Sequence, residues 1–426
     1  MKLSILRTRG FRRVTALAVA VCVAASAAGI GFFPEQTAFA AVIGHSTRTN
    51  TASASYQFLG TEMYTYKALQ SDITRLASDY SGVTTGSIGT TADGRTIYSV
   101  TIGNQSASKK ILVVGAMHGR EYITTPLIMR EAKDLLDRKA AGDAGLDSVS
   151  VEFIPMLNPD GVCISQSGID GLQNSSVKQK VTDIISSWAD WGLLTDQNKY
   201  TWYLNKWKNN ANGVDINRNF DMPGWSSLND LRDKPASDLY KGPSAESEAE
   251  TKALVNLVNQ GNFTEVVNYH AQGLCIYWKN TGLSNEVLSR DQILGKIARI
   301  DTGYQLVGGD TAAQDTTEQD GCSFKDWLDV KKGIPNITLE VGLGTSPVPE
   351  TQIEEIWQQN QKLLPDLISE LCGTYVFPAE ESSAGGDSAA SGSGASDAAG
   401  TSAGAVIGTG APSSTGGTAA VGSVPE

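Results

Sequence analysis

The chain has 426 residues and carries a formal net charge of −12. This acidic balance argues against a nucleic-acid-binding protein, because such proteins present clustered basic side chains to the phosphate backbone. Between two ends of biased composition lie about 320 residues, enough for one large domain with its own core.

The first 40 residues are typical of a secretory signal peptide. Five basic residues precede or border an apolar run from Val14 to Phe33, and the sequence TAFA then offers an A-x-A cleavage site after Ala40. The alternative is a single membrane anchor, since the apolar run is nearly long enough to span a bilayer. We expect the signal peptide to be cleaved. The mature protein would then be a secreted bacterial protein, extracellular or associated with the cell wall, with no stable membrane partner.

A low-complexity sequence of Gly, Ser, Ala and Thr occupies residues 378–426. It has almost no large apolar side chains to offset the entropy cost of ordering, so we expect a disordered tail. The tail is either a spacer through a cell wall or dispensable. Between the two ends we expect a short N-terminal arm at residues 41–62 and one folded domain at residues 63–377.

Strand and helix patterns alternate along this domain. Strands are predicted at residues 95–103, 110–117, 148–157, 264–270, 273–278 and 335–342. Helices are predicted at residues 64–80, 122–142, 176–192, 244–261, 285–303 and 351–373, with a turn at residues 158–161. The strand at residues 110–117 is apolar throughout and should be central. The pattern predicts an α/β fold, a single domain with a mixed, mostly parallel central sheet and helices on both faces.

Four cysteines remain after the signal peptide, namely Cys163, Cys275, Cys322 and Cys372. In an exported protein they could form up to two disulfides, with three possible pairings. The alternative is that they are buried free thiols. No two of them form a C-x-x-C pair, so a zinc-finger type of site is not expected.

Two of the three histidines follow predicted strands. His118 comes directly after the strand at residues 110–117, Glu121 follows three residues later, and His270 ends the strand at residues 264–270. Because ligands collect at the carboxyl ends of strands in α/β sheets, these side chains can converge. Two imidazoles and one carboxylate leave one coordination position open, as a catalytic zinc site requires. The third histidine, His45, lies in the polar arm and is not expected to take part.

Two other segments contain further polar residues that could take part in binding or catalysis. The loop NGVDINRNF contains Asp215, Asn217 and Arg218. An arginine beside an asparagine can clamp a carboxylate, and Asp215 could accept the second N–H of a metal-bound histidine. Glu340 lies on an otherwise apolar strand, so it is either paired with a cation or used as an acid or base.

These motifs together resemble the zinc carboxypeptidases of the carboxypeptidase A type. The segments HGRE, NPDG, GVDINRNF, GPSAESEAET, NYH, FKDW and TLEVG occur in the order of that family, over roughly residues 62–375. The resemblance implies a carboxypeptidase A-like fold and one zinc ion per chain. It implies His118, Glu121 and His270 as zinc ligands, with Asp215 orienting a histidine ligand.

The resemblance also implies roles for five further residues. Glu340 matches the general base, and Arg120 matches an arginine that contacts the substrate near the metal. Asn217 and Arg218 match the pair that binds the terminal carboxylate. Lys208 follows a tryptophan where the family usually has an arginine that stabilises the oxyanion.

Two other positions bear on the choice of substrate. Lys325 matches the base of the pocket for the residue beyond the scissile bond, where an unpaired ammonium would favour an acidic side chain or the second carboxylate of diaminopimelate. Alternatively, Lys325 points to solvent or pairs with Asp326 or Asp329. The family's mobile tyrosine, which helps to hold the terminal carboxylate, is replaced by Glu318.

The expected function is that of a secreted zinc metallocarboxypeptidase. It would hydrolyse peptide bonds at or near the C-terminus by a zinc-bound water that a glutamate activates. The alternative is a cell-wall γ-D-glutamyl-diaminopimelate peptidase, and a third interpretation is an inactive peptide-binding protein on the same scaffold. The expected partner is accordingly a peptide or a peptidoglycan stem peptide, and no nucleic acid.

Overall fold

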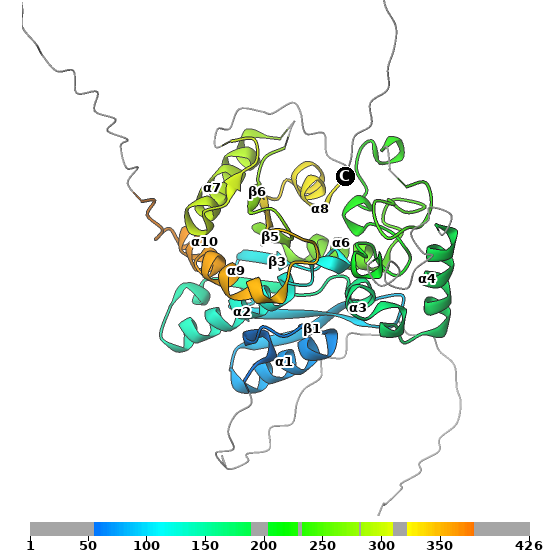
Figure 1. Cartoon of the computed structure of the whole chain (residues 1–426). Coiled ribbons are helices and arrows are strands. Elements are labelled where there is room, and N and C mark those ends of the chain that lie inside the picture. The colour runs from blue at the N-terminus through cyan, green and yellow to red at the C-terminus, as the bar shows by residue number, and fades with distance from the viewer. Residues whose placement is uncertain (1–54, 189–202, 229–231, 281–282, 310–321, 379–426) are drawn as a thin grey trace, which may run out of the picture. The chain divides into compact units, whose positions relative to one another are not determined.

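The computed structural model describes residues 55–188, 203–228, 232–280, 283–309 and 322–378 (Figure 1). The predicted signal peptide, most of the N-terminal arm, nearly all of the C-terminal tail and Glu318 lie outside these ranges. Among the described helices, none combines the length and the apolar character needed to cross a bilayer.

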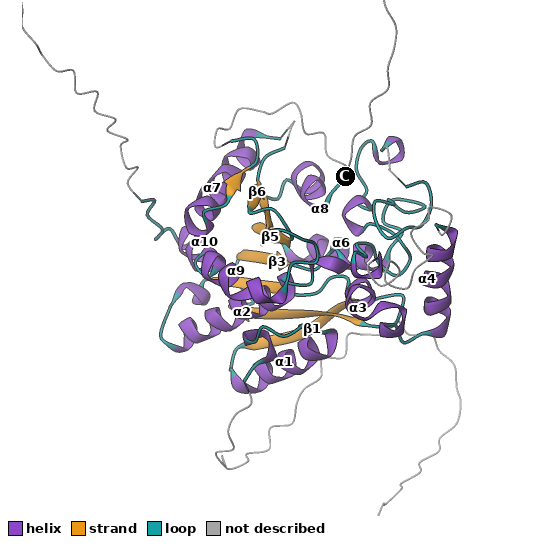
Figure 2. Cartoon of the chain, in the orientation of Figure 1, coloured by secondary structure: helices purple, strands orange, loops and turns teal. Residues whose placement is uncertain are grey.

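The described strands form one sheet of eight strands, in the order β1-β2-β4-β3-β5-β8-β6-β7. Figure 2 shows the strands at the centre of the described chain, with helices around them. The four neighbours β4, β3, β5 and β8 pair in parallel, as do β6 and β7, whereas β1 with β2, β2 with β4 and β6 with β8 are antiparallel. The predicted mixed, mostly parallel sheet is thereby confirmed. The strands are β1 (Val83–Thr90), β2 (Thr96–Gly103), β3 (Lys109–Val114), β4 (Val149–Ile154), β5 (Glu265–His270), β6 (Cys275–Tyr277), β7 (Gln305–Leu306) and β8 (Asn336–Glu340).

Helices cover both faces of the sheet. A first core cluster joins one face to α1, α2, α7, α9 and α10, and a second joins the opposite face to α6, α8 and η8 (Figure 1). The helices are α1 (Tyr66–Asp79), α2 (Thr124–Ala140), α3 (Pro159–Ser167), α4 (Ser175–Ser187), α6 (Ala249–Gly261), α7 (Asn285–Thr302), α8 (Phe324–Asp326), α9 (Ile353–Asn360) and α10 (Leu363–Cys372). The shorter helical turns are η1 (Gln57–Leu59), η2 (Gly119–Glu121), η3 (Gly145–Asp147), η4 (Gly168–Gly171), η6 (Ile216–Arg218), η7 (Trp225–Ser227), η8 (Trp327–Lys332) and η9 (Glu350–Gln352).

Strand β3 is central because both of its faces are apolar. Ile111 and Val113 belong to the first core cluster, whereas Leu112 and Val114 belong to the second. Side chains alternate between the faces of a strand, so a strand covered on both sides needs a continuous apolar run. The sequence prediction for this segment is confirmed, with β4 and β5 as its neighbours.

The predicted turn at residues 158–161 is wrong, because this segment begins helix α3. The Asn158 side chain caps the helix by accepting a hydrogen bond from the Gly161 amide, and Pro159 occupies the first turn, where its missing N–H costs nothing. The polar tetrapeptide therefore starts a helix that the sequence prediction missed.

Two predicted helices have different limits in the structure. The helix predicted at residues 351–373 is divided into α9 and α10, because Pro365 has no N–H to donate to the carbonyl of Gln361 and its ring crowds the preceding turn. The helix predicted from residue 244 begins only at Ala249, since Glu246 has a positive φ that is incompatible with a helix.

The four cysteines outside the signal peptide are all described, and each is a free thiol. The alternative of one or two disulfides among Cys163, Cys275, Cys322 and Cys372 is therefore wrong. The described fold is held together by its packed core and hydrogen bonds without cross-links.

Candidate active site

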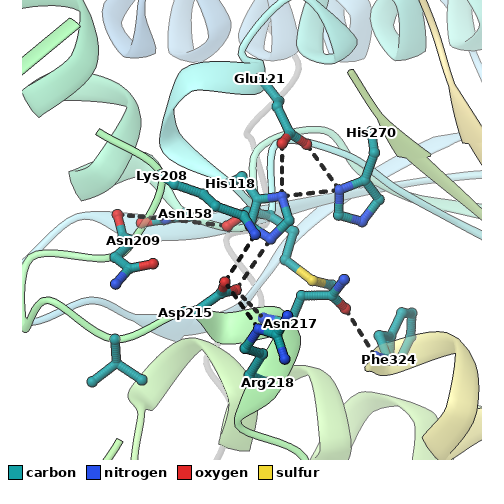
Figure 3. Close-up of polar contacts among 12 residues, drawn as sticks. His118, Glu121, Asn158, Lys208, Asn209, Asp215, Asn217, Arg218, His270 and Phe324 are labelled. Carbon is teal, nitrogen blue, oxygen red and sulfur yellow. Dashed lines mark hydrogen bonds and ion pairs between the residues drawn. The ribbon is translucent and has the colours of Figure 1, made fainter. Parts of the chain in front are cut away.

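The two histidines and the glutamate meet at the carboxyl edge of the parallel strands. His118 follows β3 and precedes the short turn η2, which carries Glu121, while His270 is the last residue of β5. The Nδ1 atoms of His118 and His270 each lie 2.8 Å from an oxygen of Glu121 and 3.1 Å from one another (Figure 3). Both rings therefore present the same nitrogen to one point.

This cluster has the donor set of a metal site. The three side chains are buried, their ligand atoms lie within 4.8 Å of one another, and among the described residues no other such cluster of His, Cys, Asp and Glu is present. Two imidazole nitrogens and one carboxylate suit zinc and leave a position for a further ligand. Burial alone would raise the pKa of Glu121, but His118 and His270 hold it well below its usual range, so the carboxylate is charged and ready to bind a cation.

Asp215 contacts His118 on the side of the ring that faces away from Glu121. Its Oδ1 lies 3.2 Å from His118 Nε2, the nitrogen that points away from Glu121 (Figure 3). Its Oδ2 lies 2.9 Å from the Lys208 ammonium, and the Arg218 guanidinium is 3.8 Å away. Asp215 is completely buried, yet Lys208 and His118 outweigh the effect of burial and hold its pKa well below the ordinary value. A charged carboxylate at this nitrogen fixes the tautomer in which Nδ1 is free to bind a metal.

The loop that carries His118 is fixed by close backbone contacts. The Gly119 amide donates to the Lys208 carbonyl at 2.7 Å, and the Asn158 side chain donates to the Met117 and Asn209 carbonyls. A Cβ atom on Gly119 would lie 2.5 Å from the backbone of Gly161, so only glycine permits this approach. The cap of α3 and the Lys208 segment therefore hold the metal-site loop from two sides.

Glu340 ends β8 directly beside His270. The two residues are partners in the parallel ladder between β5 and β8, and their side chains emerge on the same face. Burial raises the pKa of Glu340 to about 7. His270, Lys208 and Arg120 oppose this shift, and Glu121 adds to it. A carboxyl group that exchanges its proton near neutral pH has the property of an acid or base.

A polar cavity of about 490 Å³ contains all of these groups. The ten site residues expected from the sequence all line it, namely His118, Arg120, Glu121, Lys208, Asp215, Asn217, Arg218, His270, Lys325 and Glu340. The sequence prediction missed eight further lining residues, Ala271, Gln272, Tyr277, Lys279, Ser323, Asp326, Thr338 and Ser346. Thr338 could have been found, because it precedes Glu340 by two residues and so lies on the same face of the strand.

The side chain of Asn217 is held in one orientation. Its Oδ1 accepts the Phe324 amide proton at 2.9 Å, so the amide nitrogen is the end that remains for a ligand (Figure 3). Arg218 follows directly, and its carbonyl accepts the Trp225 indole N–H at 2.9 Å. The amide and the guanidinium together offer several N–H donors to the cavity.

Lys325 lines the cavity, and of the alternatives left open by the sequence the structure has the paired one. Its ammonium donates to Asp329 at 2.6 Å and to the Lys279 carbonyl at 3.1 Å. The alternative that Lys325 points to solvent is wrong, since the side chain is buried. The alternative of pairing with Asp329, one helical turn further along the chain, is confirmed. Burial alone would lower the pKa of Lys325, but Asp329 raises it, so the ammonium stays charged.

Comparison with known proteins agrees with this site. A family model described as zinc carboxypeptidase (Peptidase_M14) matches residues 69–363, more than half of the chain. The chain therefore belongs to the zinc carboxypeptidase family and is a hydrolase of the metallocarboxypeptidase type. Among solved structures, the carboxypeptidase A of Helicoverpa armigera has a TM-score of 0.55 at 17% identity, covering 74% of this chain and 74% of its own. Thrombin activatable fibrinolysis inhibitor has a TM-score of 0.56 at 16% identity, covering 75% of this chain and 76% of its own. These two similarities establish the shared fold.

Two curated relatives differ in how much of the chain they cover. The gamma-D-glutamyl-L-diamino acid endopeptidase 1 of Lysinibacillus sphaericus is 28% identical over 311 residues, which is 70% of this chain and 71% of the relative. Human carboxypeptidase B is 28% identical over 184 residues, only 40% of this chain and 35% of the relative. The similarity to the bacterial endopeptidase thus extends over most of both proteins.

We predict that His270→Ala removes most of the bound zinc from the purified protein, because only two of three ligand side chains remain. Elemental analysis of the purified variant measures the zinc content per chain. Tyr269→Phe is the control, since Tyr269 is buried next to His270 but faces the opposite core and should retain the metal. Full zinc occupancy in His270→Ala would show that the ion binds elsewhere.

Proposed function

We propose that His118, Glu121 and His270 hold one zinc ion and that the protein hydrolyses a peptide-type amide bond beside it. The proposal depends above all on the convergence of two Nδ1 atoms and a charged carboxylate within the cavity. A zinc ion held there supplies Lewis-acid chemistry, lowering the pKa of water and polarising a carbonyl group.

Glu340 is the proposed general base. It takes one proton from the attacking water as the O–C bond forms, and it passes that proton to the nitrogen of the leaving amine as the C–N bond breaks. Its position beside His270 and its pKa of about 7 support this role. No other group needs to be consumed, since water supplies the hydroxyl of the new acid and the proton of the new amine.

Arg120 and Lys208 are the proposed groups that stabilise the negative charge developing on the carbonyl oxygen. Arg120 lines the cavity, and its buried Nε has no hydrogen-bond partner among the described residues. Lys208 also lines the cavity but is bonded to Asp215. We therefore assign the larger share of this stabilisation to Arg120, while Lys208 also holds the carboxylate that orients His118.

Asn217 and Arg218 are the proposed binding site for a carboxylate on the leaving part of the substrate. The orientation of Asn217 by the Phe324 amide turns its N–H donors toward the cavity, and Arg218 adds a planar, permanently charged group. This site is compatible with a free α-carboxylate beyond the scissile bond.

The proposed substrate is a bacterial cell-wall peptide, cleaved at the bond between the γ-carboxyl group of D-glutamate and a diamino acid. The Lysinibacillus relative has a name that specifies this type of bond, and the similarity covers most of both chains. Five cationic side chains line the cavity, namely Arg120, Lys208, Arg218, Lys279 and Lys325. A γ-linked substrate has a free α-carboxylate on each side of the scissile bond, so it carries more anionic groups there than an ordinary peptide does.

A second candidate function is removal of C-terminal residues from ordinary peptides. It is favoured by the Asn217–Arg218 pair and by the similarity to carboxypeptidase B. Under either function we propose a secreted protein with a signal peptide at residues 1–40, a catalytic domain at residues 63–377 and a C-terminal tail at residues 378–426.

We predict that Glu340→Gln lowers kcat by roughly 10²–10⁴-fold and leaves the zinc content unchanged, because glutamine keeps the shape but cannot take a proton. Steady-state kinetics and elemental analysis on the same sample measure both quantities. Glu131→Gln is the matched control, since Glu131 is also a buried carboxyl group, with a pKa of about 8, but lies outside the cavity lining. A Glu340→Gln variant with wild-type kcat would assign the base to another residue.

We also predict that the protein cleaves L-Ala-γ-D-Glu-meso-diaminopimelate between glutamate and diaminopimelate, with a kcat/KM at least tenfold above that for the α-linked analogue. Mass spectrometry of the products identifies the bond that is cut. Efficient release of C-terminal residues from ordinary peptides, with the γ-linked substrate left intact, would establish the second candidate function instead.

A further inference from the structure

Arg218, the proposed carboxylate-binding residue, is positioned through its backbone. Its Nε lies 3.8 Å from Asp215 Oδ2, which is beyond hydrogen-bond distance, and 31% of its side-chain surface is exposed (Figure 3). The backbone is fixed in the turn η6, where the Arg218 amide donates to the Asp215 carbonyl at 3.0 Å. The direction of the guanidinium in the cavity therefore depends on the groups that hold this turn.

Trp225 holds the turn from outside the cavity. Its indole Nε1 donates to the Arg218 carbonyl at 2.9 Å, and the same residue begins the next helical turn, η7. Trp225 is not one of the residues that line the cavity, so it does not compete with Arg218 for a ligand there. Its hydrogen bond acts on the backbone from which the guanidinium extends.

The ammonium group of Lys241 binds the end of η7. Its Nζ donates to the carbonyls of Trp225, Ser226 and Leu228 at 3.1, 3.3 and 2.9 Å, and it lies 4.9 Å from the centre of the Trp225 ring. Carbonyls at the end of a helical turn lack partners within the turn and carry partial negative charge, so a cation with three N–H groups suits them. Attraction between the cation and the indole face adds to this. Lys241 thereby fixes the ring that bonds to Arg218.

The backbone at Lys241 holds the other side of η6. The Tyr240 carbonyl accepts from the Asp215 amide at 2.7 Å, and the Lys241 carbonyl accepts from the Asn219 side chain at 2.8 Å. Asp215 and Asn219 are the residues that flank η6. One two-residue segment therefore bonds to both ends of this turn, while the Lys241 side chain is connected to its last residue through η7.

We propose that Lys241 and Trp225 are positioning residues for Arg218 and thereby determine how strongly the protein prefers a substrate with a free carboxylate on the leaving side. The inference rests on the proposed function, in which Arg218 binds that carboxylate. Neither Lys241 nor Trp225 lines the cavity, so both act through Arg218. Loss of either contact lets the guanidinium move away from the carboxylate, which weakens substrate binding and leaves the reaction beside the metal site unaltered.

The test compares L-Ala-γ-D-Glu-meso-diaminopimelate with the analogue in which the carboxylate on the L-centre of diaminopimelate is a carboxamide. The carboxylate preference is kcat/KM for the acid divided by kcat/KM for the amide. We expect a preference of roughly tenfold or more for the wild-type mature protein, since a hydrogen bond to a charged group contributes about that factor.

Trp225→Phe keeps an aromatic ring beside Lys241 but removes the N–H that donates to Arg218. It should lower the carboxylate preference by about fivefold or more through a higher KM for the acid, with kcat and the kinetics of the amide nearly unchanged. Lys241→Met should have the same effect. Lys241→Arg keeps a cation with N–H donors, so its preference should lie closer to the wild-type value than to that of Lys241→Met.

Lys234→Met is the matched control. Lys234 also lies over an indole ring, 4.4 Å from the centre of Trp188, and it donates to the Ser187 carbonyl at 2.8 Å. It binds the end of α4 instead of η7 and does not line the cavity, so the variant should keep the wild-type carboxylate preference. Zinc content and the midpoint of thermal unfolding, measured on each variant, detect damage to the fold separately.

A fall of equal size for the acid and the amide in Trp225→Phe and Lys241→Met, or an unchanged carboxylate preference in both, would overturn the inference, because the two residues would then support only the fold. Arg218→Met tests the proposed carboxylate site by itself. If it keeps the wild-type preference, the assignment of Arg218 is wrong and the inference fails with it. If the protein cuts ordinary peptides and not the γ-linked substrate, the proposed substrate is wrong, and the same comparison between an ordinary peptide and its C-terminal amide decides the inference.

Discussion

The parallel pairing of β5 with β8 is the constraint on which the site depends. The ladder places His270 beside Glu340, and β3 on the other side of β5 brings the His118 loop to the same edge. A shift of one residue between β5 and β8 would turn one of the two side chains to the opposite core, where Tyr269 and Leu339 pack. The apolar packing of that opposite face thereby sets the position of the catalytic pair.

Electrostatics explain why so many charges can be buried in one cavity. Glu121 lies between two imidazoles, and Asp215 lies between His118 and the Lys208 ammonium, so each carboxylate has nitrogen-bearing partners on two sides. Burying an isolated carboxylate costs several kcal/mol, and paired charges with further hydrogen bonds offset that cost. Asp215 links the metal-site histidine to Lys208, so a change at Lys208 should also be felt at His118.

Much of the metal-site geometry could be predicted from the sequence. His118 and His270 each follow an apolar strand, and the carboxyl ends of parallel strands share one edge, so local patterns were enough to bring them together. The cap formed by Asn158 was missed because Asn-Pro-Asp-Gly is equally typical of a turn. The division at Pro365 could have been predicted, since the residue is a helix breaker in an otherwise periodic segment.

The hydrogen-bond partners of Lys325, which lines the cavity, could not be predicted in the same way. Whether Lys325 is unpaired or bonded to Asp329 depends on the local helical geometry and on the Lys279 carbonyl, which comes from a distant segment.

The central claim is that both histidines bind zinc through Nδ1, together with Glu121. Diffraction from crystals of the mature protein, measured on both sides of the zinc absorption edge, tests it most directly. The account predicts one anomalous peak per chain in coordination contact with His118 Nδ1, His270 Nδ1 and Glu121; a peak bound through Nε2, or a zinc ion held by other residues, would contradict it.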